Sequence, residues 1–367
     1  MTTTTTWKPI SSLITSLTER IANQTSAFAP LTLVTPSIPV HPVAALLEHL
    51  TANPVHEVYF PFLRFGVIHA ARVTTVWAGL TRGRDDRAVS VLQDLVGYLT
   101  LAWGGGTVVS LLLSQPPSWL ISPTPWLIYP IVYVLLIPTG LSRYVRSTCP
   151  SLLFDIFAAW VDGVTRGTTI ASLPTSIAAS GLRSSWLTPV MLSGIVVSSS
   201  GWLVSGYRLN EVEWGLGMPN VLTGGILDTL DLWGGMLVGL VYAALTRSHP
   251  ELNPLSIALA QILPTDIQAV GAVPLVTPDI GRAICVLLFG SLLSARVIAQ
   301  LAVGYGKTNK VRAKKTRKST MKMSLVKDEE GEIRLEELVK TPTKSDRKGA
   351  TPRKSPRPKK AQKPSSG

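Results

Sequence analysis

Charged side chains are scarce in this chain of 367 residues. Asp, Glu, Lys and Arg make up 16% of it, whereas soluble domains carry about 25%. Apolar residues make up 46%, and the mean hydropathy is positive. This balance favours a membrane protein over a soluble globular one.

The chain is also poor in the residues and motifs that catalysis and metal binding require. Its two cysteines, Cys149 and Cys285, lie in or beside apolar segments and give no disulfide framework and no metal-ligand spacing. We expect both thiols to be free and buried. The five histidines include no HExxH pair, and there is no GxSxG elbow and no phosphate loop. The chain is therefore predicted not to be an enzyme, with no small-molecule substrate and no cofactor.

The N-terminal residues lack a basic region followed by an apolar core, so they do not resemble a cleaved signal peptide. We expect the first internal apolar helix to direct membrane insertion. Residues 1–55 are predicted to be a largely disordered segment, with one short amphipathic helix near Ile10–Ala22 and a glycosylation sequon at Asn23.

Long apolar segments dominate residues 56–305. A helix needs about 20 residues to cross the hydrocarbon of a bilayer. Seven segments approach this length, and the first is marginal because it contains Arg64 and Arg72. The segments are residues 57–81, 90–114, 119–141, 150–172, 185–206, 221–246 and 281–303. The sequence thus predicts an all-α, polytopic membrane protein of about seven transmembrane helices. The apolar run 254–263 is too short to cross and suits a re-entrant or interfacial piece.

The positive charge of the chain is confined to its C-terminal end. Residues 304–367 contain 20 basic and 7 acidic residues, a net charge of +13, which equals that of the whole chain. The arginines outside the spans gather in alternate loops: Arg82, Arg84 and Arg87 after the first span, Arg143 and Arg146 after the third, and Arg208 after the fifth. There is none between the second and third spans and only Arg183 between the fourth and fifth. By the positive-inside rule, this places the arginine-rich loops and the tail in the cytosol. Seven spans then put the N-terminus, with its sequon, in a lumen.

Glycine forms four clusters inside the predicted spans. They are Gly104, Gly105 and Gly106; Gly201 with Gly206; Gly224 with Gly225; and Gly234, Gly235 and Gly239. Glycine destabilises helices, so each cluster has a cost. One explanation for such a cluster is close packing of two helices through small residues. The other is a local break in the helix that lets the backbone line a cavity. For three consecutive glycines we predict a kink.

Six ionisable residues lie at membrane depth in this scheme. They are Asp155, Asp162, Arg166, Asp228, Asp231 and Arg296. The spacing of Asp162 and Arg166 favours an ion pair on one helix face, and Asp228 and Asp231 are predicted to share a face of the sixth span. Arg296 has no carboxylate at helical spacing, so its partner must come from another helix. Two interpretations stay open: ion pairs that hold the bundle together, or groups that line a water-filled ion pathway.

Three stretches, taken in order, resemble the trimeric intracellular cation (TRIC) channel family. They are LAWGGGTVVSLLLSQPPSWL (101–120), VMLSGIVVSSSGWLVSG (190–206) and LLFGSLLSARVIAQL (287–301). They are similar to that family's glycine-containing second and fifth helices and to its seventh helix with one internal basic residue. The resemblance covers about residues 55–305.

The resemblance implies a homotrimer in which each protomer encloses a pore for monovalent cations, mainly potassium. It implies an endoplasmic reticulum or other endomembrane location, and counter-ion flow during calcium release. By position it implies kinks at Gly104–Gly106 and near Gly201, and a pore-facing Arg296. The family's fourth helix carries a Lys-Glu-Val motif that holds a phosphoinositide. The matching residues 158–167 read AAWVDGVTRG, without the lysine.

Residues 306–367 are predicted to be a basic, disordered cytosolic tail. Its first part is predicted to bind anionic lipid through Lys310, Arg312, Lys314, Lys315, Arg317 and Lys318. In the alternative function, the bundle is a non-conducting anchor and the tail binds anionic lipid or chromatin. We rank nucleic acid below membrane lipid as a partner. A small-solute transporter is a third option, which predicts an internal repeat.

Overall fold

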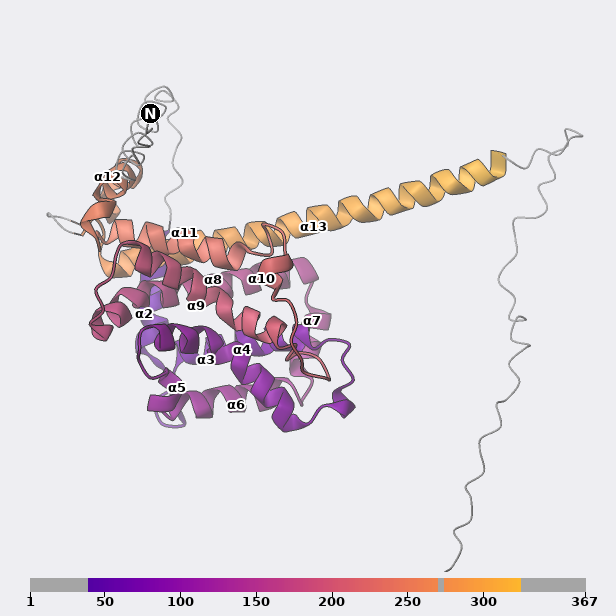
Figure 1. Ribbon diagram of the computed structural model, residues 1–367, viewed down its shortest axis with the longest axis horizontal. Helices are drawn as coiled ribbons and strands as arrows, with labels where there is room; N and C mark the ends of the chain where they lie inside the picture. Colours follow the sequence, from indigo (N-terminus) through magenta and orange to yellow (C-terminus); the bar gives the residue numbers. More distant parts are fainter. Residues whose placement is uncertain (1–38, 270–273, 325–367) are drawn as a thin grey trace, which may run out of the picture. The chain divides into compact units, whose positions relative to one another are not determined.

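The structure, a computed structural model, describes residues 39–269 and 274–324 (Figure 1). For residue 220 and residues 303–324 it describes the backbone alone. The predicted helix near Ile10–Ala22 and the Asn23 sequon lie outside the described residues. The helices and strands are α2 (Val40–Ala52), β1 (Pro54–His56), β2 (Phe60–Leu63), α3 (Arg64–Leu80), η1 (Asp86–Ala88), α4 (Val91–Leu112), α5 (Ser118–Ile121), α6 (Thr124–Leu136), α7 (Leu141–Thr148), α8 (Ser151–Ser180), α9 (Leu187–Gly206), α10 (Asn220–Thr223), α11 (Leu230–Leu245), η2 (Pro250–Leu252), α12 (Asn253–Ile262), η3 (Thr265–Ile267) and α13 (Pro278–Ser324).

The first predicted span begins later than expected. Residues 54–63 form a small antiparallel hairpin, in which Pro54 pairs with Leu63 and His56 with Phe60. Aromatic residues favour strands, and Pro61 holds its neighbour Phe60 in extended backbone. The helix α3 therefore starts at Arg64 instead of residue 57.

The third predicted span is divided into three helices. Between α6 and α7 the chain bends by 60°. Pro138 lies in this break and cannot donate a backbone hydrogen bond. Gly140 has φ 72°, a left-handed conformation that glycine adopts at little cost.

The fourth predicted span is longer than expected, because α8 continues to Ser180 and ends at Gly181, which has φ 68°.

The helix α9 lies between α4 and α11 and packs closely against both (Figure 1). A Cβ on Gly105 of α4 would lie 2.1 Å from the Val196 carbonyl oxygen of α9. On the other side, a Cβ on Gly239 of α11 would lie 2.2 Å from Ser193 Oγ of α9. Only glycine allows these backbones to approach so closely, as the GxxxG spacing of Gly235 and Gly239 predicts.

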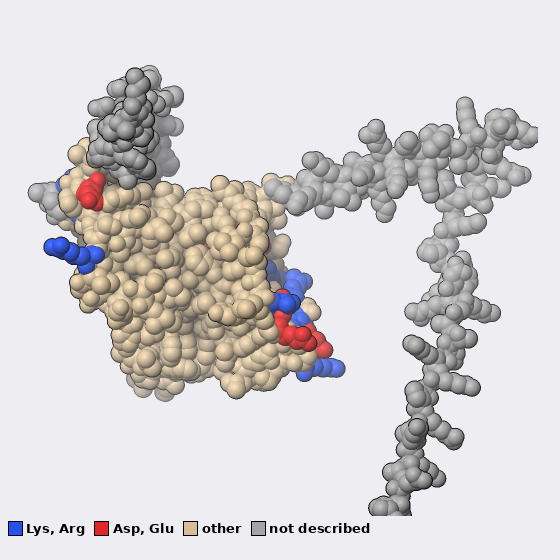
Figure 2. All heavy atoms as spheres, in the orientation of Figure 1, with Lys and Arg blue, Asp and Glu red and all other residues tan. Residues whose placement is uncertain are grey.

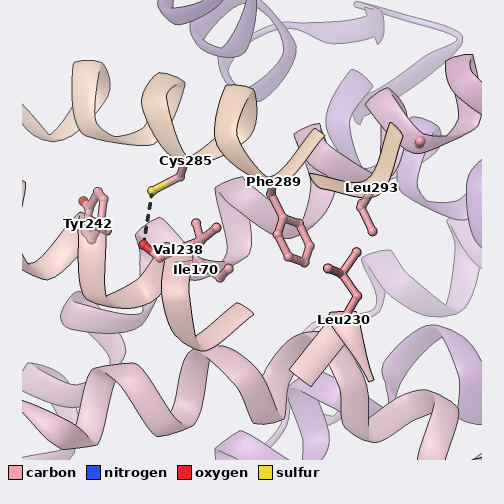
Figure 3. Packing of buried hydrophobic residues seen from close by; sticks show 8 residues of the cluster. Ile170, Leu230, Val238, Tyr242, Cys285, Phe289 and Leu293 are labelled. Atoms are coloured by element: carbon pink, nitrogen blue, oxygen red, sulfur yellow. Dashed lines mark hydrogen bonds between the residues drawn. The ribbon is translucent and has the colours of Figure 1, made fainter. Parts of the chain in front are cut away.

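A largely apolar core joins α8, α11 and α13 (Figure 3). Phe289 of α13 is fully buried, and a Cβ on Gly234 of α11 would lie 3.3 Å from its ring. Cys285 is buried in the same cluster, where its Sγ lies 4.0 Å from the Val238 carbonyl oxygen. Cys149, in contrast, is exposed in the link between α7 and α8. The prediction that both thiols are buried is thus wrong for Cys149, because a turn, and not an apolar helix, carries it.

Among residues 39–269 and 274–324, three helices are long and apolar enough to cross a membrane: Val91–Leu112, Leu187–Gly206 and Pro278–Ala302. The bent pair α6 and α7 is a fourth if it counts as one span, and α11 is apolar but shorter. In the view of Figure 2, charged side chains lie toward two ends of the bundle and leave a broad face without them. These features indicate a membrane protein built mainly of helices.

The chain divides into two compact units, Met1–Val303 and Gly304–Gly367. The helix α13 begins in the first unit and continues to Ser324. The start of the predicted disordered tail is therefore helical. Residues 307–324 contain no proline or glycine and are rich in lysine and arginine, which tolerate helices well.

Candidate functional site: the charged residues of the bundle

The six predicted intramembrane charges do not form the pairs that their spacing suggested. Asp162 of α8 accepts two hydrogen bonds from Arg72 of α3, one from Nε at 2.9 Å and one from Nη2 at 2.7 Å. This bidentate contact is the strongest geometry for a guanidinium and a carboxylate. Asp162 is buried. The expected pair between Asp162 and Arg166 on one helix face is replaced by contacts to other helices, because both side chains face neighbours across the bundle.

Asp231 links three helices. Its Oδ1 lies 2.7 Å from Arg166 Nη1 of α8 and 3.0 Å from Arg296 Nη1 of α13. The prediction that Arg296 pairs with another helix is confirmed. One carboxylate thus faces two guanidinium groups, which gives this triad a formal net charge of +1.

Glycines bring α8 and α13 close enough for this triad. A Cβ on Gly163 would lie 2.6 Å from the Gly290 Cα, and one on Gly167 would lie 2.9 Å from the Val286 Cα. Gly163 and Gly167 have GxxxG spacing and flank Arg166. Sequence reasoning missed this motif, although its spacing is visible in the sequence.

Asp228 is separate from Asp231. The sixth predicted span is interrupted, since α11 begins only at Leu230, and Asp228 lies in the preceding turn, where its Oδ2 accepts a hydrogen bond from Gly225 N at 3.1 Å. The two carboxylates therefore do not share a helix face. A cavity of about 390 Å³ opens beside this turn. It is lined by Thr223, Gly224, Leu227, Asp228, Arg296 and Gln300.

Asp155 belongs to the surface of the bundle. It lies at the start of α8, 3.9 Å from Arg146 of α7, and both side chains are well exposed. Such an exposed pair contributes little to stability, so Asp155 does not belong to the buried network.

The glycine run of α4 falls in an unbroken helical assignment, Val91–Leu112. Gly104 and Gly105 face α9, and the Gly105 N–H donates to Ser200 Oγ at 2.7 Å. Gly106 and Gly201 have open space where a Cβ would lie, and a Cβ on Gly206 would be 3.5 Å from Pro219. Close packing accounts for Gly104 and Gly105, and the kinks at Gly104–Gly106 and Gly201 stay predictions.

Some buried polar groups have no partner among the described residues. Among them are the hydroxyls of Thr168 on α8, Ser199 on α9 and Ser294 on α13. A buried hydroxyl without a hydrogen bond is costly, and water commonly satisfies such groups. These hydroxyls favour a partly hydrated interior.

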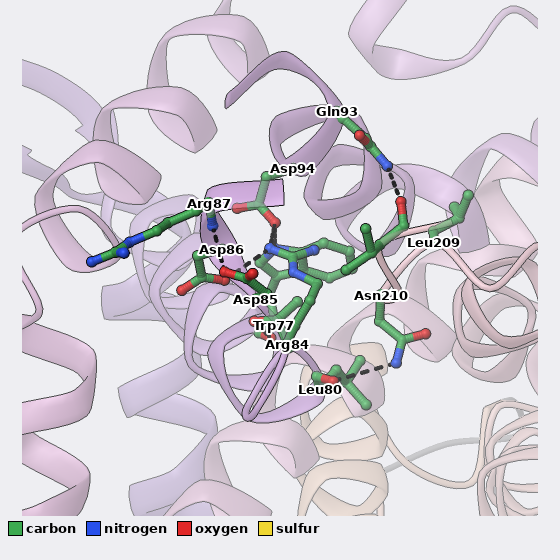
Figure 4. A network of polar contacts seen from close by, with 12 residues as sticks. Trp77, Leu80, Arg84, Asp85, Asp86, Arg87, Gln93, Asp94, Leu209 and Asn210 are labelled. Carbon is green, nitrogen blue, oxygen red and sulfur yellow. Dashed lines mark hydrogen bonds and ion pairs between the residues drawn. The ribbon is translucent and has the colours of Figure 1, made fainter. Parts of the chain in front are cut away.

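A second charged network went unnoticed in the sequence (Figure 4). Asp94 of α4 is buried and accepts hydrogen bonds from Trp77 Nε1 at 3.0 Å, from the Tyr133 hydroxyl and from Arg84. The presence of Asp94 inside a predicted span was the signal available. Arg84 was interpreted only as a marker of topology.

The predicted lipid-binding residues of the tail lie on α13, in the part for which the structure describes the backbone alone. They are Lys310, Arg312, Lys314, Lys315, Arg317 and Lys318. Within the described residues there is no group of three His, Cys, Asp or Glu that could hold a metal ion.

Comparisons with known proteins found no family model, no curated protein and no solved structure that matches this chain. The likeness to the TRIC family therefore rests on the three quoted stretches.

Proposed function

We propose that this chain is a channel for monovalent cations, mainly potassium, in an intracellular membrane. The observation that carries the proposal is the triad of Arg166, Asp231 and Arg296, which joins three helices of the bundle. Charged groups at membrane depth are costly, and they commonly mark ion pathways.

The surroundings of the triad support ion passage. Arg296 lines a cavity whose other charged group is Asp228. Unpartnered hydroxyls on three helices favour water inside the bundle. The preference for cations is taken from the resemblance to the TRIC family.

The remaining parts of the proposal come from loop charges and from the same resemblance. We infer seven spans, with an N-terminus in the lumen and a C-terminus in the cytosol. The proposed assembly is a homotrimer with a pore in each protomer, kinked at Gly104–Gly106 and Gly201. The proposed role is counter-ion flow during calcium release from the endoplasmic reticulum or another endomembrane store.

Reconstitution of the purified full-length chain into planar bilayers tests the proposal. We expect single-channel currents that reverse at the potassium equilibrium potential in asymmetric KCl. The control is a mock purification from cells that lack the protein, reconstituted identically. No potassium-selective current at either polarity from folded wild-type protein would refute the proposal.

An anchor function is the second candidate, and the distribution of charge favours it. All of the net charge of +13 lies in residues 304–367, which form a separate unit. Deletion of residues 307–367 distinguishes the two functions. A channel keeps its conductance without the tail, whereas an anchor loses vesicle or chromatin binding and has no conductance to lose.

A further inference from the structure

A second pocket, of about 420 Å³, lies between the end of α3, the loop that follows it, and α7. It shares no residue with the cavity beside Arg296. Four arginines line it: Arg82, Arg84, Arg143 and Arg146. The hydroxyl residues Ser142 and Ser147 of α7 line it as well, and Asp86 is its one acidic lining residue.

Arg84 is the deepest of the four arginines. Its side chain is 7% exposed. Its Nη2 contacts Asp94 and lies 3.4 Å from Asp86 Oδ1. Its Nε and Nη1 are buried and have no hydrogen-bond partner among the described residues. A buried N–H group without an acceptor is costly, and Arg84, which carries two of them, lines the pocket.

Asp94 holds this guanidinium in place (Figure 4). The carboxylate is itself fixed by Trp77 and Tyr133, from α3 and α6. The donors of Arg84 are therefore oriented before any ligand arrives, which lowers the entropic cost of binding.

The other arginines are only partly neutralised. Arg143 donates to Asp86 Oδ2 at 2.6 Å, and Arg146 lies 3.9 Å from Asp155 while its guanidinium rests 5.7 Å from the Phe154 ring centroid. Arg82 makes no ion pair within the described residues. Four arginines thus face Asp86 in the pocket and Asp94 and Asp155 at its edges, which leaves a formal net charge of +1.

We propose that this pocket binds a phosphate monoester. Guanidinium groups form paired hydrogen bonds with phosphate oxygens, and a phosphate monoester dianion offers enough acceptors for several arginines at once. A carboxylate has two oxygens and one negative charge, whereas a phosphate monoester dianion has three terminal oxygens and two charges, so the phosphate offers more to a site of several arginines. The ligand is either the headgroup of an anionic lipid or a soluble phosphate, and the test distinguishes them. This inference does not depend on ion conduction.

The test measures binding to the full-length chain in neutral detergent. One arm titrates dioctanoyl phosphatidic acid, whose headgroup is a phosphate monoester, and the other titrates inorganic phosphate. Dioctanoyl phosphatidylserine, a phosphodiester with a carboxylate, is the lipid control. The variants are Arg82→Ala/Arg143→Ala and Arg84→Lys, and the matched control is Arg87→Ala, in the same loop but outside the pocket lining. The basic tail is present in every variant, so its contribution cancels.

We expect the double variant to bind phosphatidic acid about tenfold or more weakly than Arg87→Ala, given the strength of hydrogen bonds to charged groups. The Arg84→Lys variant keeps the positive charge but loses the bidentate guanidinium donors, so it should also bind phosphatidic acid more weakly. A loss for phosphatidic acid alone identifies a lipid headgroup, and a parallel loss for inorganic phosphate identifies a soluble ligand. Both results support the site.

Equal affinities of the double variant and Arg87→Ala for both ligands would overturn the proposal. So would a phosphatidylserine affinity that equals that of phosphatidic acid and falls as much in the double variant. If Arg84→Lys fails to fold, the double variant decides alone, because Arg82 and Arg143 are exposed.

Discussion

Arg166 of α8 and Arg296 of α13 approach the same oxygen of one carboxylate, Asp231 Oδ1, at 2.7 Å and 3.0 Å. The two guanidinium groups repel each other, so their proximity depends on the charge between them. The side chains of all three residues are 21–28% exposed. This geometry makes Asp231 the residue on which the arrangement of three helices depends.

The Asp231→Asn substitution should therefore destabilise the bundle strongly. It leaves two partly buried arginines without a counter-charge, and breaking a buried pair costs about 3–5 kcal/mol. The measurement is the free energy of unfolding from a titration with SDS in mixed micelles. The control is Asp228→Asn, an exposed carboxylate in the preceding turn, which should change stability by about 0.5 kcal/mol or less. Equal effects of the two substitutions would mean that the triad does not hold the helices together.

Two neighbouring glycines should respond in opposite ways to the same substitution. A Cβ on Gly105 would lie 2.1 Å from the Val196 carbonyl oxygen, so Gly105→Ala forces α4 and α9 apart, at about 1–3 kcal/mol for overpacking. A Cβ on Gly106 meets nothing within 4 Å, so Gly106→Ala should stabilise the helix by up to about 1 kcal/mol. The same titration measures both variants. A Gly106→Ala variant as unstable as Gly105→Ala would contradict this packing and favour a kink at the glycine run.

The helical class and the positions of most helices followed from apolar length alone, because lipid-facing segments must be long and apolar. Chain breaks were harder to place. The division of residues 119–141 depends on Pro138 and Gly140, and whether a proline breaks a span or only bends it depends on packing that the sequence does not state. The hairpin before Arg64 was missed for a similar reason, since a short apolar run is ambiguous between strand and helix.

The charged residues were identified from the sequence, but their partners were not. Spacing along one helix suggested that Asp162 pairs with Arg166, whereas the structure pairs it with Arg72, 90 residues away in the chain. Partners across a bundle depend on which helix faces meet. For Arg296 the absence of a local carboxylate was itself informative, because it required a partner from another helix.

The contact between Arg72 and Asp162 permits a charge-swap test. Arg72→Asp and Asp162→Arg each place two like charges together in the bundle, and each should cost about 3–5 kcal/mol of unfolding free energy. The double variant restores opposite charges and should recover at least half of this loss. A double-mutant cycle measures the coupling. The exposed pair Arg143 and Asp86, with side chains 71% and 48% exposed, is the control, and its coupling should be about 0.2–1 kcal/mol.

No recovery in the swapped variant would show that packing around Asp162, and not its charge, determines the stability. Asp162 is buried between helices, and arginine is much larger than aspartate. Asp162→Asn, which keeps the size of the side chain, separates the two effects. It should cost stability in the wild-type background and little once Arg72 is replaced by glutamine.

If the bundle conducts potassium as proposed, Arg296→Gln should raise the unitary conductance. Arg296 lines the cavity beside Asp228, and loss of its positive charge lowers the barrier to a cation there. A unit charge at 4 Å contributes about 1 kcal/mol in a water-like dielectric, which corresponds to an increase of about two- to fivefold. Asp231 keeps Arg166 as a partner, so the bundle should stay folded.

The control is the Arg183→Gln variant, which changes an exposed residue in the loop after α8. Its unitary conductance should equal that of the wild type. An unchanged conductance in Arg296→Gln would place the ion path away from this cavity, and a lower one would mean that Arg296 maintains the open path instead of opposing the ion.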